Sequence, residues 1–509
     1  MNNWIIMPAV LPAFTAAFLL LTLRHRLHAQ RIVSVVATAL GLLVAIGLAV
    51  EASDGVPQAY RLGDWPAPFG IVLVLDRLSA TLLVLTGLLA LCVVLYASAG
   101  WDRRGQHFHT LLQFQLLGIN GAFLTGDVFN LFVFFEVMLI ASYGLMLHGG
   151  CPARLKAGFH YVAINLIASA LFLIGVGLIY AVTGTLNMAD LALKVPEVVP
   201  ADQSLLKAGA LLLFLVFATK AALVPLHWWL PATYAATSAP AAAIFMIMTK
   251  VGAYAILRVY GLVFGAEAGA LALVAAPFVL PAAVVTLLLG TVGVVGSRSL
   301  RSLSAFAIIA SMGTLLIALG LFDQAGVSAA LYYIVHSSLA GAALFLLAGL
   351  VLEGRGAMGD RLLPGPAMRG EVLVGGLFLL CAVAMVGLPP LSGFLGKVMI
   401  LEAVRSSASW PWLWALILGS SLALTLGFVR AGSVLFWASG PATGETRRPP
   451  AALPLTAIVL LLALTGAWTG AAGPAMVWID ATARQALDRA SYVEAVLGPT
   501  NHRSGGLGE

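Results

Sequence analysis

The chain has 509 residues, of which 61% are hydrophobic and only 9% carry a charged side chain. Soluble domains carry a charge on about a quarter of their residues, so this composition excludes an ordinary soluble protein and predicts a polytopic membrane protein. The net charge of +6 therefore reports membrane topology and does not indicate a nucleic-acid partner. The three cysteines lie far apart and form no CxxC pair, so we expect no disulfide framework, no metal site and no cofactor.

Apolar runs long enough to cross a bilayer follow one another along the chain. A transmembrane helix needs about 20 predominantly apolar residues. The first run has no basic segment before it, which predicts a retained span and not a cleaved signal peptide. The predicted spans are residues 4–23, 31–50, 73–99, 110–126, 128–147, 159–182, 206–230, 240–263, 272–296, 303–322, 327–352, 371–401, 411–437 and 451–472. We expect an all-α fold of about 14 transmembrane helices, then an amphipathic tail on the membrane surface or against a neighbouring element.

Basic residues in the connections predict the orientation of the chain. They collect in the loops after odd-numbered spans, at Arg24, Arg26, Arg31, Arg103, Arg104, Arg154, Lys156, Arg298, Arg301, Arg355, Arg361, Arg369, Arg447 and Arg448. The opposite loops carry few basic residues, and these are mixed with acids. Cytoplasmic loops carry the excess of Lys and Arg. We therefore expect a multi-pass protein of the cell inner membrane with both termini on the non-cytoplasmic side.

Six titratable side chains lie deep inside predicted spans: Glu136, Lys220, His227, Lys250, His336 and Lys397. A charged residue at the bilayer centre costs roughly 2.5–3.5 kcal/mol on insertion scales. A Glu–Lys ion pair that only fixes helix packing is one interpretation, and each histidine alone could be a satisfied polar residue. One acid cannot pair with three lysines, however, so the series favours a proton relay. Arg258 lies near a span end, and we expect it to extend to the membrane interface.

Prolines interrupt two of the spans close to a lysine. Pro225 follows Lys220, and Pro389 and Pro390 precede Lys397. Proline removes a backbone donor and breaks a helix, and broken helices in corresponding positions of two halves mark transport sites. We expect broken helices 7 and 12 in two inverted five-helix repeats, helices 4–8 and 9–13. The expected organisation is residues 1–109 for helices 1–3, 110–263 and 272–437 for the two repeats, and 451–509 for helix 14 and the tail.

Five segments occur in this order along the chain: FFEVMLIASYGL, TKAALVPLHWWLPATYAATSAPAAAI, MTKVGAYAILR, SLRSLSAFAIIASMG and GLPPLSGFLGK. In these segments the chain resembles the antiporter-like subunits that Mrp-type multisubunit cation/proton antiporters share with respiratory complex I. The resemblance covers roughly residues 70–440. It implies fourteen helices, Glu136 paired with Lys220, His227 between Lys220 and Lys250, Lys250 as the central relay residue, His336 at the start of the second half-channel and Lys397 as the terminal proton site.

One departure from the resemblance concerns Gly341, where many relatives have a lysine after the histidine of helix 11. The second half-channel would then depend on His336, Ser337, Ser338 or water.

We expect one component of a hetero-oligomeric antiporter complex that exchanges Na⁺, or another monovalent cation, for H⁺ and is surrounded by membrane lipid. The alternative is a proton-pumping membrane component of a complex I-like NADH dehydrogenase or membrane-bound hydrogenase, with the redox groups in partner subunits. A purely structural scaffold fits the charge series poorly.

Overall fold

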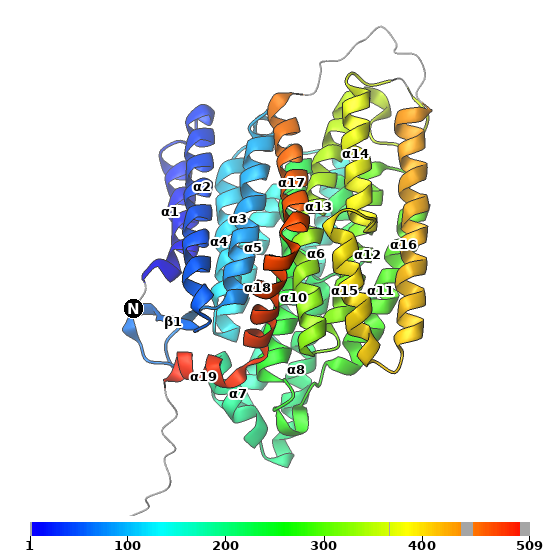
Figure 1. The fold of residues 1–509 in the computed structure, drawn as a ribbon. Helices are drawn as coiled ribbons and strands as arrows, with labels where there is room; N and C mark the ends of the chain where they lie inside the picture. Colours follow the sequence, from blue (N-terminus) through cyan, green and yellow to red (C-terminus); the bar gives the residue numbers. More distant parts are fainter. Residues whose placement is uncertain (1–2, 366, 439–450, 499–509) are drawn as a thin grey trace, which may run out of the picture.

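The computed structural model describes residues 3–365, 367–438 and 451–498. Helices run side by side through the described chain (Figure 1). They are α1 Met7–Leu21, α2 Leu27–Glu51, α3 Arg77–Ala97, α4 Phe108–Leu124, α5 Val128–Leu147, α6 Pro152–Thr183, α8 Pro200–Lys220, α9 Trp229–Ala236, α10 Ala239–Arg258, α11 Ala276–Gly296, α12 Leu300–Leu319, α13 Gln324–Gly354, α14 Glu371–Val386, α15 Ser392–Ala403, α16 Trp410–Gly432 and α17 Ala452–Gly470. Three further helices are α7 Met188–Lys194, α18 Ala472–Leu487 and α19 Arg489–Leu497.

Twelve helical segments of the described chain are long and apolar enough to cross a membrane. Two of the expected crossings are not among them. One is α4, which has 17 residues, and the other is the span that is divided into α14 and α15. With these two, the helices follow the fourteen predicted spans in order. The protein is therefore an all-α polytopic membrane protein.

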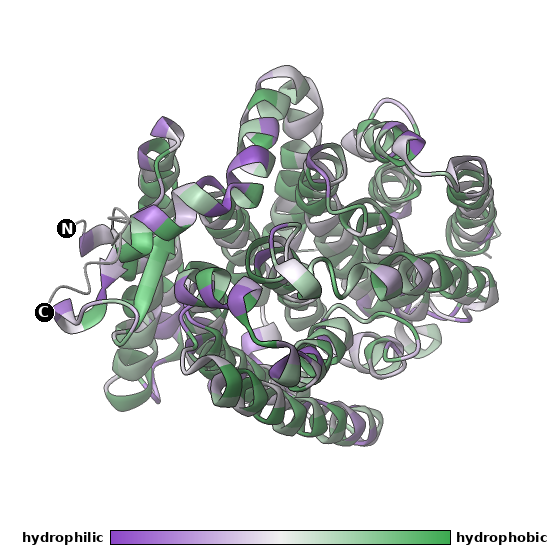
Figure 2. Ribbon diagram, turned by 90° about the horizontal axis from the view of Figure 1, so that it is seen from below, coloured by the Kyte–Doolittle hydropathy of each residue, from purple (hydrophilic) through white to green (hydrophobic). Residues whose placement is uncertain are grey.

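The two helices at the centre of the bundle are α10, which is buried along its whole length, and α13, which is buried from Gly326 to Val351. Helices α2, α11 and α16 instead expose much of their apolar surface, as expected where lipid or another chain covers them. Figure 2, which views the molecule from below, shows hydrophobic residues on most helices and hydrophilic ones gathered in a few segments. Lys250 of α10 and His336 of α13 are thus enclosed by protein on all sides.

Both broken helices are present. The seventh predicted span divides after Lys220 into α8 and α9, and the twelfth divides after Val386 into α14 and α15. The irregular segments contain Pro225 in one case and Pro389 and Pro390 in the other. The breaks that the prolines predict are therefore confirmed.

A short antiparallel hairpin, β1 Gln58–Arg61 and β2 Val72–Leu75, lies at the lower end of the molecule in Figure 1. The third span was expected to start at residue 73 but begins at Arg77, because Asp76 caps α3 through a capping box with Ser79.

Strand β1 contacts both the first helical turn of the described chain and α19, so the two ends of the described chain lie on the same side. The tail helix α18 packs against α13 and α3, which decides between the two expected positions.

An ion-pair cluster lies at the opposite end, between α3 and α4. The carboxylate of Asp102 accepts two hydrogen bonds from Arg31, at 2.6 and 2.7 Å, and lies 3.1 Å from His109 Nε2. Burial raises the pKa of the Asp102 carboxyl, but the hydrogen bonds from Arg31 and His109 outweigh it and bring the pKa to about 2. This cluster ties α2 to the loop before α4.

Two parts of the chain share one geometry at a separation of 172 residues. Helices α5 and α12 both have 20 residues, starting at Val128 and Leu300, and α6 and α13 start at Pro152 and Gln324. The close approaches of glycine to the next helix also recur. In the first part, a Cβ added to Gly118 would collide with Met138, and one added to Gly121 with Phe134. In the second part, a Cβ added to Gly290 would collide with Ala310, and one added to Gly293 with Phe306. At this separation α4–α6 therefore correspond to α11–α13.

Candidate functional site

The carboxylate of Glu136 and the ammonium of Lys220 contact the same short stretch of α6. Ser169 donates a hydrogen bond to Glu136, and Lys220 Nζ donates to Asn165 Oδ1 at 2.7 Å. Asn165 and Ser169 are four residues apart, so they are neighbours on one face of α6. Glu136 and Lys220 form no direct ion pair in the part of the chain that the structure describes. In this structure, α6 side chains connect the two groups that the resemblance implies to be paired.

The break after α8 spans residues 221–228. One backbone group freed by the break finds a partner, since Val224 N–H donates to Thr286 Oγ1 at 2.9 Å. Irregular backbone at membrane depth requires such partners from protein or water. His227 lies in this segment and is partly exposed, and its Nδ1 has no hydrogen-bond partner within the described residues. The relay role of His227 stays a prediction.

Lys250 lies on α10, close to the point where this helix touches the break. Its side chain is fully buried, and Nζ has no hydrogen-bond partner among the residues described. A Cβ added to Gly252 would lie 2.5 Å from the backbone nitrogen of Ala221, so glycine is needed for α10 to approach the end of α8. A buried ammonium without a partner is costly in free energy. Packing alone therefore does not account for a lysine at this position.

The second break is organised around His336 and Lys397. His336 Nδ1 lies 2.9 Å from the hydroxyl of Ser392, the first residue of α15. Lys397 Nζ donates to Val386 O at 2.6 Å and to Ser421 Oγ at 2.7 Å. Val386 ends α14, so its carbonyl is one that the break leaves without a helical partner, and a cation at a helix C-terminus is favourable. Lys397 thus gives the carbonyl at the end of α14 a hydrogen-bond partner and links it to α16.

At the 172-residue separation, Gly341 of the second half corresponds to Ser169 of the first half. Ile308 corresponds in the same way to Glu136. A Cβ on Gly341 would meet Met246 Cε at 2.4 Å and Ile308 Cδ1 at 2.9 Å. An apolar contact therefore replaces the hydroxyl–carboxylate pair, and a longer side chain at Gly341 would have to displace Met246. The second half differs from the first in its chemistry while keeping its backbone geometry.

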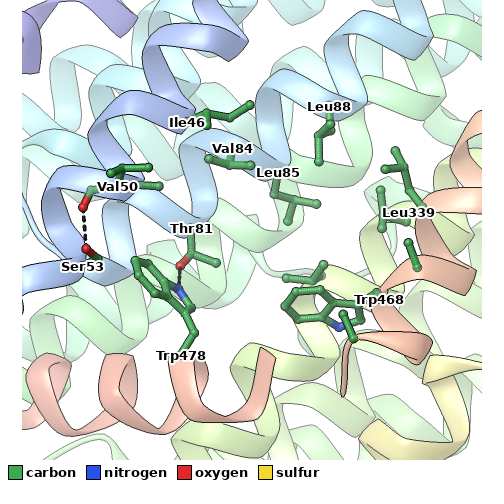
Figure 3. A pocket seen from close by; sticks show the side chains of 15 residues that line it. Ile46, Val50, Ser53, Thr81, Val84, Leu85, Leu88, Leu339, Trp468 and Trp478 are labelled. Atoms are coloured by element: carbon green, nitrogen blue, oxygen red, sulfur yellow. Dashed lines mark hydrogen bonds between the residues drawn. The ribbon is translucent and has the colours of Figure 1, made fainter. Parts of the chain in front are cut away.

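A cavity of about 590 Å³ opens beside the second half, between α2, α3, α13, α17 and α18 (Figure 3). Its lining is almost entirely apolar and includes Ile46, Val50, Leu85, Leu88, Val335, Leu339, Leu464, Trp468 and Trp478. The indole of Trp478 donates to Thr81 Oγ1 at 2.8 Å, so its polar edge is already paired. An ordered water needs about two to four polar partners, and this lining offers few of them. The cavity is therefore not a water route to His336, although two neighbours of His336 on α13 line it.

Sequence reasoning was wrong about one charged side chain. Arg258 is only 3% exposed, and its guanidinium lies 2.6 Å from the carboxylate of Asp76. The same group lies over the rings of Tyr254 and Tyr492. Arg258 does not extend to the interface, because an acid from the loop before α3 reaches it in the interior.

Sequence reasoning also missed the polar partners of the relay candidates. Asn165, Ser169, Ser392 and Ser421 each bond to one of the candidate side chains. The available sign was the i, i+4 spacing of Asn165 and Ser169 in an otherwise apolar run. Ser392 and Ser421 give no comparable sign in the sequence, since the side chains that they contact lie on other helices.

Residues 125–424 match the family model described as "NADH:quinone oxidoreductase/Mrp antiporter, TM". The chain belongs to this family. The matched segment runs from the start of α5 into α16 and contains all six candidate residues.

Relatives within the family match nearly the whole chain. The D subunit of a probable K(+)/H(+) antiporter from Rhizobium meliloti (strain 1021) is 42% identical, covering 98% of each chain. The D subunit of an Na(+)/H(+) antiporter from Alkalihalophilus pseudofirmus is 37% identical, covering 98% of this chain and all of the relative. A chain in the structure of the Mrp complex from Dietzia sp. DQ12-45-1b aligns with a TM-score of 0.87 at 28% identity, over 98% of this chain and 100% of that chain. The protein is therefore similar over its full length to the D subunits of Mrp-type antiporters.

Proposed function

We propose that the chain is the proton-translocating component of a multisubunit monovalent cation/proton antiporter. The observation that carries this proposal is the burial of three lysines without carboxylate partners. Lys220, Lys250 and Lys397 are 5%, 0% and 7% exposed, and none forms an ion pair within the described residues. A structural ion-pair network would show such pairs, whereas a buried lysine without a carboxylate partner gives up its proton readily.

The proposed path starts at Lys220 and Glu136. A proton on Lys220 is held by Asn165, and the Glu136 carboxylate acts on it through the same face of α6. Transfer to Lys250 is the next step, with His227 and water in the break as the carriers. A charge on one buried group changes the proton affinity of its neighbours strongly where the effective dielectric is low.

The second half of the path leads from Lys250 to Lys397. His336 and Ser392 form its polar contact between α13 and α15, and Gly341 contributes no charge. Lys397 is the terminal site in this proposal. From α15, Lys397 donates one hydrogen bond to α14 and one to α16, so movement of α14 against α16 would change how firmly the proton is held.

The matched halves support two inverted repeats over residues 110–263 and 272–437. Each repeat contributes one broken helix, and the 172-residue register relates their first three helices. Five helices per repeat is an odd number, so the second repeat would cross the membrane in the opposite sense.

The loops rich in arginine are proposed to lie in the cytoplasm, by the positive-inside rule. Both ends of the described chain would then lie outside, next to the hairpin of β1 and β2. Accessibility tags at residues 30, 104 and 360 should label only from the cytoplasmic side, and a cytoplasmic C-terminus would contradict the fourteen crossings.

The exchanged cation is proposed to be Na⁺ or K⁺, because the names of the two relatives above specify one or the other. The partners are proposed to be the other subunits of an Mrp-type complex, and the location the plasma membrane.

The test is cation-induced collapse of a pH gradient in inverted vesicles that contain the complete complex and no electron donor. Glu136→Gln should nearly abolish exchange while a native gel shows the assembled complex. The matched control is Glu353→Gln, since Glu353 is an exposed acid that pairs with Arg104. Wild-type exchange in Glu136→Gln would reduce this acid to a packing residue. A wild-type complex that moves protons only with an electron donor would favour the redox-driven alternative.

A further inference from the structure

The same correspondence relates two pairs of hydrogen-bonded loops at opposite ends of the molecule, which we call cradles. Their residues before α5 and α12 are 172 apart, and those of the partner loops are 174 apart. In the first, Val128 N–H donates to Leu186 O at 2.9 Å, and Met188 N–H donates to Gly126 O at 2.8 Å. In the second, the corresponding bonds run from Leu300 N–H to Asp360 O at 2.8 Å and from Leu362 N–H to Arg298 O at 2.9 Å. The capping residues of α5 and α12, Asp127 and Ser299, are likewise 172 residues apart.

Each cradle has an arginine from the corresponding helix of its half. Arg258 lies over the ring of Tyr492, which lies next to Gly126 of the first cradle, and Arg430, 172 residues after Arg258, bonds to Ser297 next to the second. Arg258 is paired with the carboxylate of Asp76. Arg430 donates a hydrogen bond to Ser297 O at 2.6 Å and forms no ion pair in the described chain.

The first cradle is covered by the chain itself. Strand β2 lies on it, with Gly126 N–H donating to Val72 O at 2.9 Å and Leu73 bridging to Thr125. The Asp76 carboxylate comes directly after this strand and neutralises the arginine. An anionic group thus completes the first cradle.

No described segment covers the second cradle in the way that strand β2 covers the first. A cavity of about 770 Å³ lies there, lined by Gly296, Ser297, Arg298, Ser299, Arg361, Leu362, Leu363, Arg430 and Val434. No carboxylate lines it within the described residues. The nearest one on these loops, Asp360, is already held by Arg301 at 3.1 Å. The side chains of Arg298 and Arg361 make no hydrogen bond to any part of the chain that the structure describes.

We propose that the second cradle binds the phosphate headgroup of an anionic phospholipid, in the place that the Asp76 carboxylate takes in the first. Guanidinium groups bind phosphate through paired, charge-assisted hydrogen bonds, and basic pockets between helices at the cytoplasmic face are suited to anionic headgroups. Arg298, Arg361 and Arg430 carry three positive charges, and one carboxylate would neutralise only one of them.

The surroundings of the cavity favour a lipid over a soluble anion. Below the arginines, α11 and α16 pack together and expose apolar side chains on the outer surface of the bundle. Val292 and Val295 on α11 are 67% and 43% exposed, and Leu426 and Val429 on α16 are 62% and 59% exposed. Acyl chains attached to a headgroup in the cavity would cover this surface.

The experiment measures lipid binding to the delipidated full-length chain by native mass spectrometry and by thermal shift. The probes are dioctanoyl-phosphatidylglycerol, dioctanoyl-phosphatidylcholine and inorganic phosphate. We expect one phosphatidylglycerol bound at least tenfold more tightly than phosphatidylcholine, with inorganic phosphate giving no comparable thermal shift. The Arg298→Gln/Arg361→Gln double variant should lose this preference. Arg369→Gln, which removes a charge from the same face outside the cavity, should keep it.

Arg430→Gln provides a second variant, since its hydrogen bond to Ser297 O could affect folding; the melting temperature without lipid controls for this. Equal affinity for the two lipids would overturn the proposal, and so would a preference that survives in the double variant. Inorganic phosphate that stabilises the chain as well as phosphatidylglycerol would assign the cavity to a soluble anion instead. Loss of the preference when the chain is measured in the assembled complex would assign it to an acidic segment of another protein in the complex.

Discussion

Replacing Asn165 by leucine tests whether α6 couples Glu136 to Lys220. The change keeps the size of the side chain but removes the acceptor that lies 2.7 Å from Lys220 Nζ. It leaves the hydrogen bond between Ser169 and Glu136 in place. The lysine then has no acceptor from the described chain, while the acid keeps its own partner.

The size of the effect follows from the kind of bond that is lost. A hydrogen bond to a charged group contributes about 1.5–3 kcal/mol. If protonated Lys220 is a state that every exchange cycle visits, the loss corresponds to roughly 10- to 150-fold in rate. Ser169→Ala should cause a loss of similar size, because it removes the hydroxyl that Glu136 accepts from.

The assay is the initial rate of cation-induced pH-gradient collapse in inverted vesicles, normalised to assembled complex on a native gel. The matched control is Asn120→Leu on α4, which removes a 2.8 Å hydrogen bond to Pro8 O away from the candidate residues. It should leave the rate within about twofold of wild type. A wild-type rate in Asn165→Leu would refute the idea that α6 mediates this interaction.

Three further variants test other parts of the account. Lys397→Ala should abolish exchange, and Lys397→Arg should also impair it because a guanidinium does not release its proton; full activity in the arginine variant would show that fixed charge suffices. Gly252→Ala should reduce both assembly and exchange, since its Cβ would meet backbone at 2.5 Å, whereas Gly177→Ala, with nothing within 4 Å, should have no effect. Asp102→Asn should lower the melting temperature of the purified chain, because breaking a buried ion pair costs about 3–5 kcal/mol. In the wild type, the contribution of the depressed Asp102 pKa should be complete above about pH 4 and lost as the pH falls towards 2.

Most of the helical architecture could be predicted because the bilayer requires long apolar runs and basic loops. The span 128–147 coincides with α5, and the prolines located both breaks. The hairpin was missed because strand β2, Val72–Leu75, is as apolar as the helix that follows it, and hydropathy cannot separate the two. The 172-residue register was present in the sequence as paired glycines, but its meaning depends on contacts with the next helix.

The candidate site was predictable only in part. Buried lysines stand out in a sequence because they are costly in a membrane, so Lys220, Lys250 and Lys397 could be identified as a set. Their partners were harder to identify, because the only sign of Asn165 was its spacing with Ser169, and Ser421 is a common residue type on another helix. Their relay role stays a prediction.

The central claim is that protons pass between the two halves through the lysine at the centre of α10. The most direct test is the rate of cation-induced pH-gradient collapse in vesicles carrying Lys250→Met, with assembly of the complex checked on a native gel. Methionine fills a similar volume in this fully buried position and cannot carry a proton. The account predicts an assembled complex with no measurable exchange, and exchange at the wild-type rate in Lys250→Met would contradict it.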